Sequence, residues 1–203
     1  MTRRPEPQAI WRRSLAEEEW RRTADASFRR DARSDERGEW RLAPGMPDRW
    51  VVEYAYKRMR LRMRLGLTSF KHVGIFPEQA ANWNFIYDNC RALAGDGPTD
   101  GESVAAVGSG VARGGAPKVL NLFAYTGGAT MACAAAGAQV CHCDAAKGMV
   151  AWAKDNARLS GLSDAPIRWI VDDCGKFVER EIRRGKTYDA IILSLIHISE
   201  PTR

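Results

Sequence analysis

The sequence lacks long apolar runs and paired cysteines. No apolar stretch in its 203 residues approaches the roughly 20 that cross a bilayer, so the sequence predicts a protein with no membrane span. The first residues, MTRRPEPQ, have no apolar segment behind their arginines, which argues against a secretory signal. The five cysteines show no paired spacing, which excludes a disulfide scaffold and favours a reducing compartment. We therefore expect a cytoplasmic protein.

The chain does contain enough apolar material for a core, and it carries an excess of positive charge. Hydrophobic residues make up 45% of the chain and charged residues 28%, a composition typical of a folded domain. The formal net charge of +6 permits a polyanionic partner such as RNA without requiring one. The length predicts one ordinary domain with some additional chain.

Residues 1–49 are polar and are expected to form a partly helical N-terminal arm. The range from Pro7 to Asp35 is predicted to be helical because opposite charges recur at short spacings, for example at Glu17 and Arg21. A solvated helix and an arm that contacts RNA are both compatible with this pattern.

Residues 50–93 are expected to form a small strand-rich module that ends in a helix. A strand is predicted at Trp50–Tyr54, and Arg58–Leu65 alternates between basic and apolar residues with the period of a half-buried strand. The inward face of this second strand carries Met59, Leu61, Met63 and Leu65, and the outward face carries Arg58, Arg60, Arg62 and Arg64. The arginine face suits contact with RNA phosphates and equally suits a solvated strand.

The same module is predicted to contain a return strand at Lys71–Phe76. Pro77 is expected to stop that strand and to open a helix that runs to Leu93. Residues 94–116 are dense in glycine and poor in large apolar groups, which predicts a flexible loop.

Strands and helices alternate over residues 117–193. Strands are predicted at 119–123, 139–143, 167–171 and 188–193, and helices at 128–136, 146–159 and 176–184. This alternation predicts an α/β fold with right-handed parallel crossovers. We expect an incomplete, Rossmann-like doubly wound sheet of the first three to four strands, preceded by a small α+β module.

The segment NLFAYTGGAT, Asn121–Thr130, joins the first of these strands to a helix. Its glycines permit a tight turn and a close approach of the backbone to a ligand. The amino end of the following helix suits a carboxylate group of that ligand. The segment lacks the G-x-G-x-x-G pattern, which weakens the case for a nicotinamide cofactor.

Acidic residues follow the next two strands. Asp144 lies about 20 residues beyond the glycine turn, where an acid accepts hydrogen bonds from ribose hydroxyls in doubly wound nucleotide sites. Asp172 and Asp173 end the third strand, where an acid can accept a hydrogen bond from an adenine amino group. At each position a helix-capping role is the alternative, and at Asp144 both roles can hold together.

Three segments together, NLFAYTGG, CDAAKGMVAWAKDNARLSGL and VDDCGKFVER, resemble the class I S-adenosylmethionine-dependent methyltransferases. They are most similar to the branch that contains the large-subunit ribosomal RNA cytosine-C5 methyltransferases. The segment GIFPEQAANW resembles the same branch, in which a glutamine-containing turn precedes the nucleotide fold. The resemblance extends over roughly residues 50 to 193 and implies methyl transfer from S-adenosylmethionine to RNA.

The resemblance also implies roles for individual residues. It places Asp144 at the ribose hydroxyls and Asp173, more than Asp172, at the adenine. Gln79 would close the pocket from the front module. Asn156 is either a supporting contact or, as the preferred interpretation, a polar residue on a helix face. The methionine end of the cofactor would be lined by Phe123, Tyr125, Thr126, Gly127 and Gly128.

Two motifs of the resembling family are missing. In the family an Asp-Pro-Pro motif follows the fourth strand, and a later cysteine attacks C6 of the pyrimidine, whereas Leu193 is followed here by Ser194. Leu193–Arg203 resembles the translation of a transposase sequencing adapter, so residues 194–203 are expected to be a non-native tail. We therefore expect a truncated methyltransferase domain at 117–193 with no catalytic residue, weak cofactor affinity and an open apolar edge.

The cysteine spacing argues against a metal site, and the residues leave two other functions open. Cys141 and Cys143 share one strand face and lack a second pair of ligands, so we assign no metal and expect core thiols. A nicotinamide-dependent oxidoreductase and a basic RNA-binding protein with a degenerate nucleotide fold remain alternatives.

Overall fold

The computed structural model describes residues 15–31, 37–69, 72–95 and 115–193. The chain divides into two compact units, one of residues 1–51 with 64–75 and the other of residues 52–63 with 76–203. The predicted domain boundaries at residues 49, 93 and 116 stay predictions. Most of the predicted loop at 94–116 and all of the predicted tail at 194–203 lie outside the described residues. Within the described ranges, no helix is both long and apolar enough to cross a bilayer.

The first unit contains helix α1 (Glu17–Thr23) and an antiparallel strand pair, β1 (Ala26–Arg30) with β2 (Gly38–Leu42). Arg21 donates to Glu17 at 2.7 Å within α1, as the charge pattern predicts. The prediction of helix is wrong for Ala26–Arg30. Phe28 lies opposite Trp40 across the strand pair, with 5.1 Å between ring centroids, and such pairing overrides a local charge pattern. Residues 7–14 and 32–35 of the predicted helix lie outside the described part.

Strands β3 (Arg49–Tyr56) and β4 (Met59–Gly66) pair as a two-stranded sheet. The predicted burial of β4 is confirmed, since its four apolar positions, Met59, Leu61, Met63 and Leu65, are all buried. The predicted return strand is wrong over the described residues 72–76, which form no strand. Gly74 there has a φ of 94°, which breaks an extended backbone.

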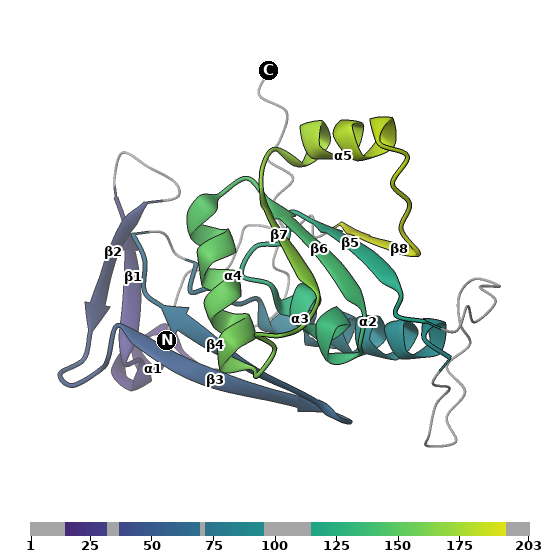
Figure 1. Ribbon diagram of the computed structural model, residues 1–203. Helices are drawn as coiled ribbons and strands as arrows, with labels where there is room; N and C mark the ends of the chain where they lie inside the picture. Colours follow the sequence, from purple (N-terminus) through teal and green to yellow (C-terminus); the bar gives the residue numbers. More distant parts are fainter. Residues whose placement is uncertain (1–14, 32–36, 70–71, 96–114, 194–203) are drawn as a thin grey trace. The chain divides into compact units, whose positions relative to one another are not determined.

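The second unit contains the inner part of the β3–β4 hairpin, a short 3₁₀ turn η1 (Pro77–Gln79) and helix α2 (Ala80–Leu93). The predicted helix start near Pro77 is confirmed, because η1 begins at Pro77 and leads directly into α2. Its larger part alternates strands with helices. These elements are β5 (Lys118–Leu122), α3 (Gly128–Ala135), β6 (Gln139–Asp144), α4 (Lys147–Leu159), β7 (Ile167–Val171), α5 (Cys174–Arg183) and β8 (Ala190–Leu193) (Figure 1).

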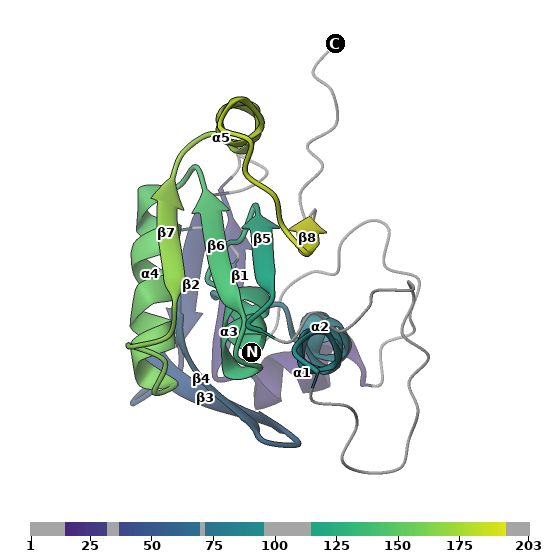
Figure 2. The ribbon, with the colours of Figure 1, turned by 45° about the vertical axis from the view of Figure 1, so that its right-hand side comes forward.

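The four strands form one parallel sheet in the order β7-β6-β5-β8 (Figure 2). The chain steps outward from β5 to β7 and then returns to the other side of β5 to form β8. The order therefore reverses between β5 and β8, and ligands of open α/β sheets bind at the carboxyl ends of strands beside such a point. The predicted α/β fold class is confirmed.

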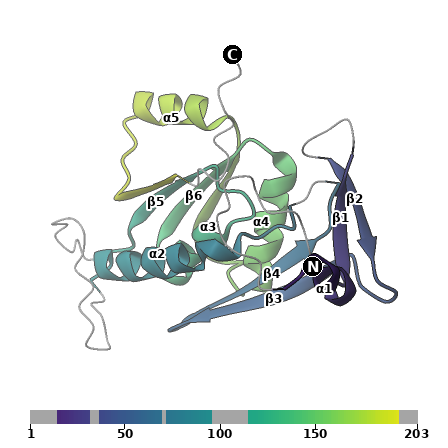
Figure 3. The same ribbon diagram turned by 180° about the vertical axis from the view of Figure 1, so that it is seen from behind.

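The two faces of the sheet pack against different helices. Leu120, Leu122, Cys141 and Cys143 form an apolar cluster with Phe177 of α5. Since side chains alternate along a strand, the residues between them face α3 and α4. Helix α2 packs beside α3 (Figure 3).

Strand β8 is the last strand of this sheet among the described residues. Its Ile191 and Leu193 are 62% and 55% exposed. This is the apolar edge that the sequence predicts.

Candidate functional site

The loop between β5 and α3 has an unusual backbone. Phe123 and Tyr125 have φ values of 53° and 52°, and Gly127 has a φ of 87°. For a residue other than glycine this left-handed conformation costs about 1–2 kcal/mol. Strain of this kind clusters at ligand-binding and catalytic sites. The loop is the segment that the sequence singles out, and it lies at the carboxyl end of β5 beside the switch point.

Neighbouring elements hold this loop through its backbone N–H groups. Three donors in succession have acceptors at the end of β6 or the start of α5. The bonds run from Phe123 to the Cys174 Sγ (3.3 Å), from Ala124 to the Cys143 carbonyl (3.2 Å) and from Tyr125 to the Asp144 carboxylate (2.9 Å). Because three acceptors fix successive residues, the strained conformation is determined from outside the loop.

Asp144 uses both of its carboxylate oxygens in the protein. Oδ2 accepts the Tyr125 N–H and Oδ1 accepts the Ala146 N–H, each at 2.9 Å. Ala146 is the residue that precedes α4, so Asp144 joins the loop after β5 to the start of α4. A carboxylate oxygen has two lone pairs, so each oxygen retains one acceptor position. The geometry is compatible with the predicted ribose contact.

The two adjacent glycines are required for different reasons. Gly127 has the positive φ described above, and a Cβ there would lie 3.0 Å from the Ala153 Cβ. At Gly128 a Cβ would lie 2.8 Å from ring atoms of Trp83 in α2. The second glycine therefore makes room for a protein side chain, and close approach to a ligand is not needed to explain it. The sequence pattern did not identify Trp83.

The two acids after β7 have separate roles in the structure. Asp172 forms an ion pair with Arg180. Asp173 caps α5, since its Oδ1 accepts the Lys176 N–H at 2.9 Å. Asp173 therefore has the predicted helix-capping role, and its carboxylate keeps further acceptor positions, so the adenine contact stays a prediction. Asp173 is exposed whereas Asp172 is half-buried and paired, so Asp173 is the more accessible acceptor.

A buried polar network lies behind the loop and was not predicted. The Asn121 Nδ2 donates to the Thr130 Oγ1 at 2.8 Å, and that hydroxyl lies 2.9 Å from the His142 Nδ1. All three side chains have no exposed surface, and they join β5, α3 and β6. Burial, and then the positive charge of Lys154, lower the pKa of His142 to about 3, so its ring is neutral at pH 7. The sequence signal that could have identified this network is the presence of polar residues, Asn121 and His142, at strand positions that face the core.

Asn156 also supports the loop. It is fully buried, and its Nδ2 donates to the Thr126 carbonyl at 3.0 Å. The interpretation of Asn156 as an ordinary polar residue on a helix face is therefore wrong. Thr126 itself is 3% exposed, whereas Phe123 is 47% exposed, so Phe123 offers far more surface to a ligand than Thr126 does.

Gln79 lies at the end of the η1 turn. Its Oε1 accepts the Asn82 Nδ2 at 2.7 Å. Phe76, at the start of this turn, has its ring 5.3 Å from the Tyr125 ring. The ring contact brings the turn beside the glycine loop, which is compatible with the predicted role of Gln79.

The four arginines of the predicted basic face differ in their surroundings. Arg58 is exposed in the turn before β4, and Arg60 is exposed and donates to two carbonyls of its own hairpin. Arg62 forms an ion pair with Glu53 at 3.0 Å, and Arg64 is half-buried. The face is therefore less uniformly charged than the sequence alternation suggests.

The cysteines are buried thiols. All five are free and buried, and Cys141 and Cys143 belong to the apolar cluster under α5, which confirms the expectation of core thiols. Burial raises the pKa of Cys143, and neighbouring Cys174 adds to the shift. Among the residues that the structure describes, no group of three or more histidines, cysteines or acids could hold a metal ion.

Comparisons with known proteins agree with this geometry. Residues 111–198 match a family model described as S-adenosylmethionine-dependent methyltransferase. A ribosomal RNA large subunit methyltransferase K/L of Shewanella baltica is 40% identical over 86 residues, which is 42% of this chain and 11% of that protein. The Shewanella frigidimarina protein of the same name is 31% identical over 133 residues, covering 65% of this chain and 15% of that protein. The chain thus spans about a tenth of the length of these relatives.

Solved structures show the same fold. A SAM-dependent methyltransferase from Agrobacterium tumefaciens has a TM-score of 0.71 and 38% identity, covering 93% of this chain and 52% of that chain. A putative methyltransferase from Streptococcus mutans has a TM-score of 0.56 and 20% identity, covering 76% of this chain and 34% of that one. Residues 111–198 therefore match the S-adenosylmethionine-dependent methyltransferase family model, and the strained glycine loop and the acids after the second and third strands of the sheet lie within the matched range.

Proposed function

We propose that this chain carries the S-adenosylmethionine-binding part of an RNA methyltransferase. The observation that carries the proposal is the position of Asp144. At the switch point of the sheet, its carboxylate holds the strained loop after β5 and keeps one acceptor position on each oxygen. Because the chain covers only part of the length of its relatives, the activity and the substrate remain proposals.

The residues around Asp144 fit an adenosine-bearing sulfonium with a carboxylate group. Asp144 and Asp173 supply acceptors for ribose hydroxyls and an adenine amino group, and Phe123 supplies an exposed apolar surface. The free N–H groups of the first turn of α3 suit the carboxylate. When bound, S-adenosylmethionine supplies an electrophilic methyl group. The residues of this chain hold and orient it, and we assign none of them to the transfer step itself.

RNA is the proposed substrate class. More specifically, we propose ribosomal RNA, with cytosine C5 as the atom that accepts the methyl group. The curated relatives carry the name ribosomal RNA large subunit methyltransferase K/L. The net charge of +6 and the exposed Arg58 and Arg60 suit contact with phosphates.

Ligand titration tests the cofactor. S-adenosylhomocysteine should raise the unfolding temperature of the chain and NAD should not. In NMR spectra its addition should shift the amide signals of residues 123–128 and Asp144. Stabilisation by NAD alone would contradict the proposal and favour an oxidoreductase.

Asp173→Asn tests the adenine contact without removing the helix cap. Asparagine caps helices about as well as aspartate, so the fold should persist. Loss of the charged acceptor should weaken S-adenosylhomocysteine binding about three- to tenfold. Asp164→Asn, at an exposed turn position, is the matched control. If both variants bind alike, the assignment of Asp173 is wrong.

Arg58→Gln tests the RNA contact. The variant should bind RNA more weakly and with a smaller dependence of affinity on salt concentration. Arg183→Gln, which removes an exposed charge from the last turn of α5, is the control. An equal effect of both variants would indicate general charge attraction rather than a site on the hairpin.

A further inference from the structure

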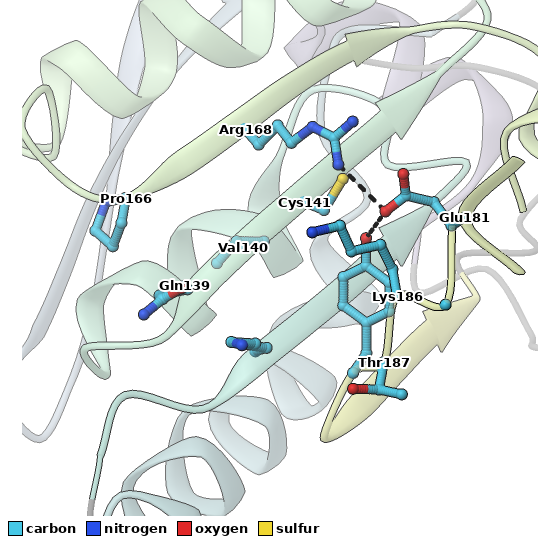
Figure 4. A pocket seen from close by; sticks show the side chains of 11 residues that line it. Gln139, Val140, Cys141, Pro166, Arg168, Glu181, Lys186 and Thr187 are labelled. Atoms are coloured by element: carbon cyan, nitrogen blue, oxygen red, sulfur yellow. Dashed lines mark hydrogen bonds and ion pairs between the residues drawn. The ribbon is translucent and has the colours of Figure 1, made fainter. Parts of the chain in front are cut away.

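A hollow lies at the amino ends of the strands, away from the glycine loop. Lys118 and Gln139 are the first residues of β5 and β6, Pro166 precedes β7, and residues 185–188 close the other side. Figure 4 shows this hollow, here called the amino-edge hollow. Its volume is about 460 Å³, within the range of roughly 300–1,000 Å³ found for small-molecule sites. Because strands of five or six residues span about 17–20 Å, it is separate from the carboxyl-end site.

The wall of the amino-edge hollow contains a buried carboxylate with three donors. Glu181 is 3% exposed and accepts hydrogen bonds from the Tyr188 hydroxyl at 2.5 Å, from Arg168 at 3.2 Å and from Arg184 at 3.3 Å. Burial alone would raise the pKa of Glu181, but the Tyr188 hydroxyl and Arg168 outweigh burial and lower it. The carboxylate is therefore charged, and two guanidinium groups face one negative charge.

Arg168 keeps donors for a further partner. Its guanidinium has five N–H groups, of which the Nη1 bonds to Glu181, and it also lies over the Phe177 ring at 5.5 Å. These contacts fix the group, while its side chain remains 49% exposed. Arg168 therefore presents an oriented set of donors at the wall of the hollow.

Two lysines add charge that the described residues do not neutralise. Lys186 lines the hollow from the loop before β8. The amino groups of Lys186 and Lys118 form no ion pair with any residue in the described ranges. The lining thus carries three cations and one carboxylate. That carboxylate, Glu181, already accepts hydrogen bonds from three protein donors.

We propose that the amino-edge hollow binds a phosphate group, held by Lys186, Lys118 and the free N–H groups of Arg168. Arginine and lysine are the side chains that suit phosphate oxygens, through fixed donors and a mobile point charge respectively. The hollow is larger than a lone phosphate needs, so the phosphate can be free or part of a nucleotide or an RNA strand. The proposal does not depend on the proposed cofactor site.

Lys186→Gln tests the proposal, with Lys154→Gln as the matched control. Both lysines are exposed, so neither change should alter the unfolding temperature, and Lys154 lies on α4 away from the hollow. The full chain, labelled with nitrogen-15, is titrated with inorganic phosphate, adenosine monophosphate and a short single-stranded RNA. Phosphate should shift the amide signals of residues 185–188, and Lys186→Gln should weaken binding about fivefold or more while Lys154→Gln binds normally.

Three results would overturn the proposal: equal loss in both variants, shifts scattered over surface lysines, or no saturable shift. The probes separate the sources of the phosphate. Equal affinity for inorganic phosphate and the nucleotide indicates a free phosphate site, whereas much tighter binding of RNA that depends on Lys186 indicates a site for an RNA backbone. A parallel titration with S-adenosylhomocysteine reports on residues 123–128, so failure of the cofactor proposal is distinguishable from failure of this one.

Discussion

Removal of the Asp144 carboxylate should destabilise the chain in two measurable steps. In the native structure its two oxygens each accept one backbone N–H at 2.9 Å, from Tyr125 and from Ala146. Asp144→Asn keeps one acceptor oxygen and loses the charge. Asp144→Ala keeps no acceptor, and both N–H groups then lose their protein partner.

The size of the effect follows from these two bonds. A hydrogen bond to a charged group contributes about 1.5–3 kcal/mol, and the half-buried position of Asp144 places its bonds at the lower end of that range. The left-handed conformation of Tyr125 also loses one of its restraints. We expect a loss of about 1–2 kcal/mol in Asp144→Asn and about 2–4 kcal/mol in Asp144→Ala.

Urea unfolding of the two variants measures these losses in the free energy of unfolding. The dependence of that free energy on urea concentration should be the same in both variants. Asp164→Ala is the control, because Asp164 is exposed and its removal should change stability by less than about 0.5 kcal/mol. Equal stabilities of the asparagine and alanine variants, or an alanine variant as stable as the control, would refute the argument that Asp144 holds the loop.

Three further predictions concern the structure behind the loop. Gly128→Ala should cost about 1–3 kcal/mol in urea unfolding, because its Cβ would lie 2.8 Å from the Trp83 ring, and Trp83→Phe should reduce that cost. Thr130→Val should lower the free energy of unfolding by about 1–3 kcal/mol, because the hydroxyl joins two buried groups. Thr130→Ser keeps the hydroxyl and should lower it by about 1 kcal/mol. Equal losses in the two variants would show that packing alone matters. The pKa of His142 is lowered from 6.5 to about 3, so between these pH values the unfolded chain binds a proton that the folded chain does not. Stability should therefore fall by up to about 1.4 kcal/mol per pH unit as the pH drops below 6.5, and His142→Gln should remove this part of the slope in unfolding measured across a pH series.

The order of strands and helices from residue 117 to residue 193 was predictable from the sequence. The predicted strand at 167–171 coincides with β7, and the other predicted elements there differ from the observed ones by a few residues at their ends. Apolar periodicity and the glycine turn are local signals, and in this segment local preference and tertiary packing agree. The same holds for β4, whose alternation placed its four apolar side chains inside.

Contacts between residues far apart in the chain decided the rest. Pairing of Phe28 with Trp40 made a strand of a segment with a helical charge pattern, and Trp83 in α2 explains the glycine at 128. The amino-edge hollow combines a carboxylate of α5 with an arginine of β7 and a lysine of a later loop. Sequence by itself determined the fold class and the position of the glycine loop, because these depend on periodicity and backbone freedom. Only the tertiary structure decided which groups lie together, because side-chain proximity depends on how separate elements pack.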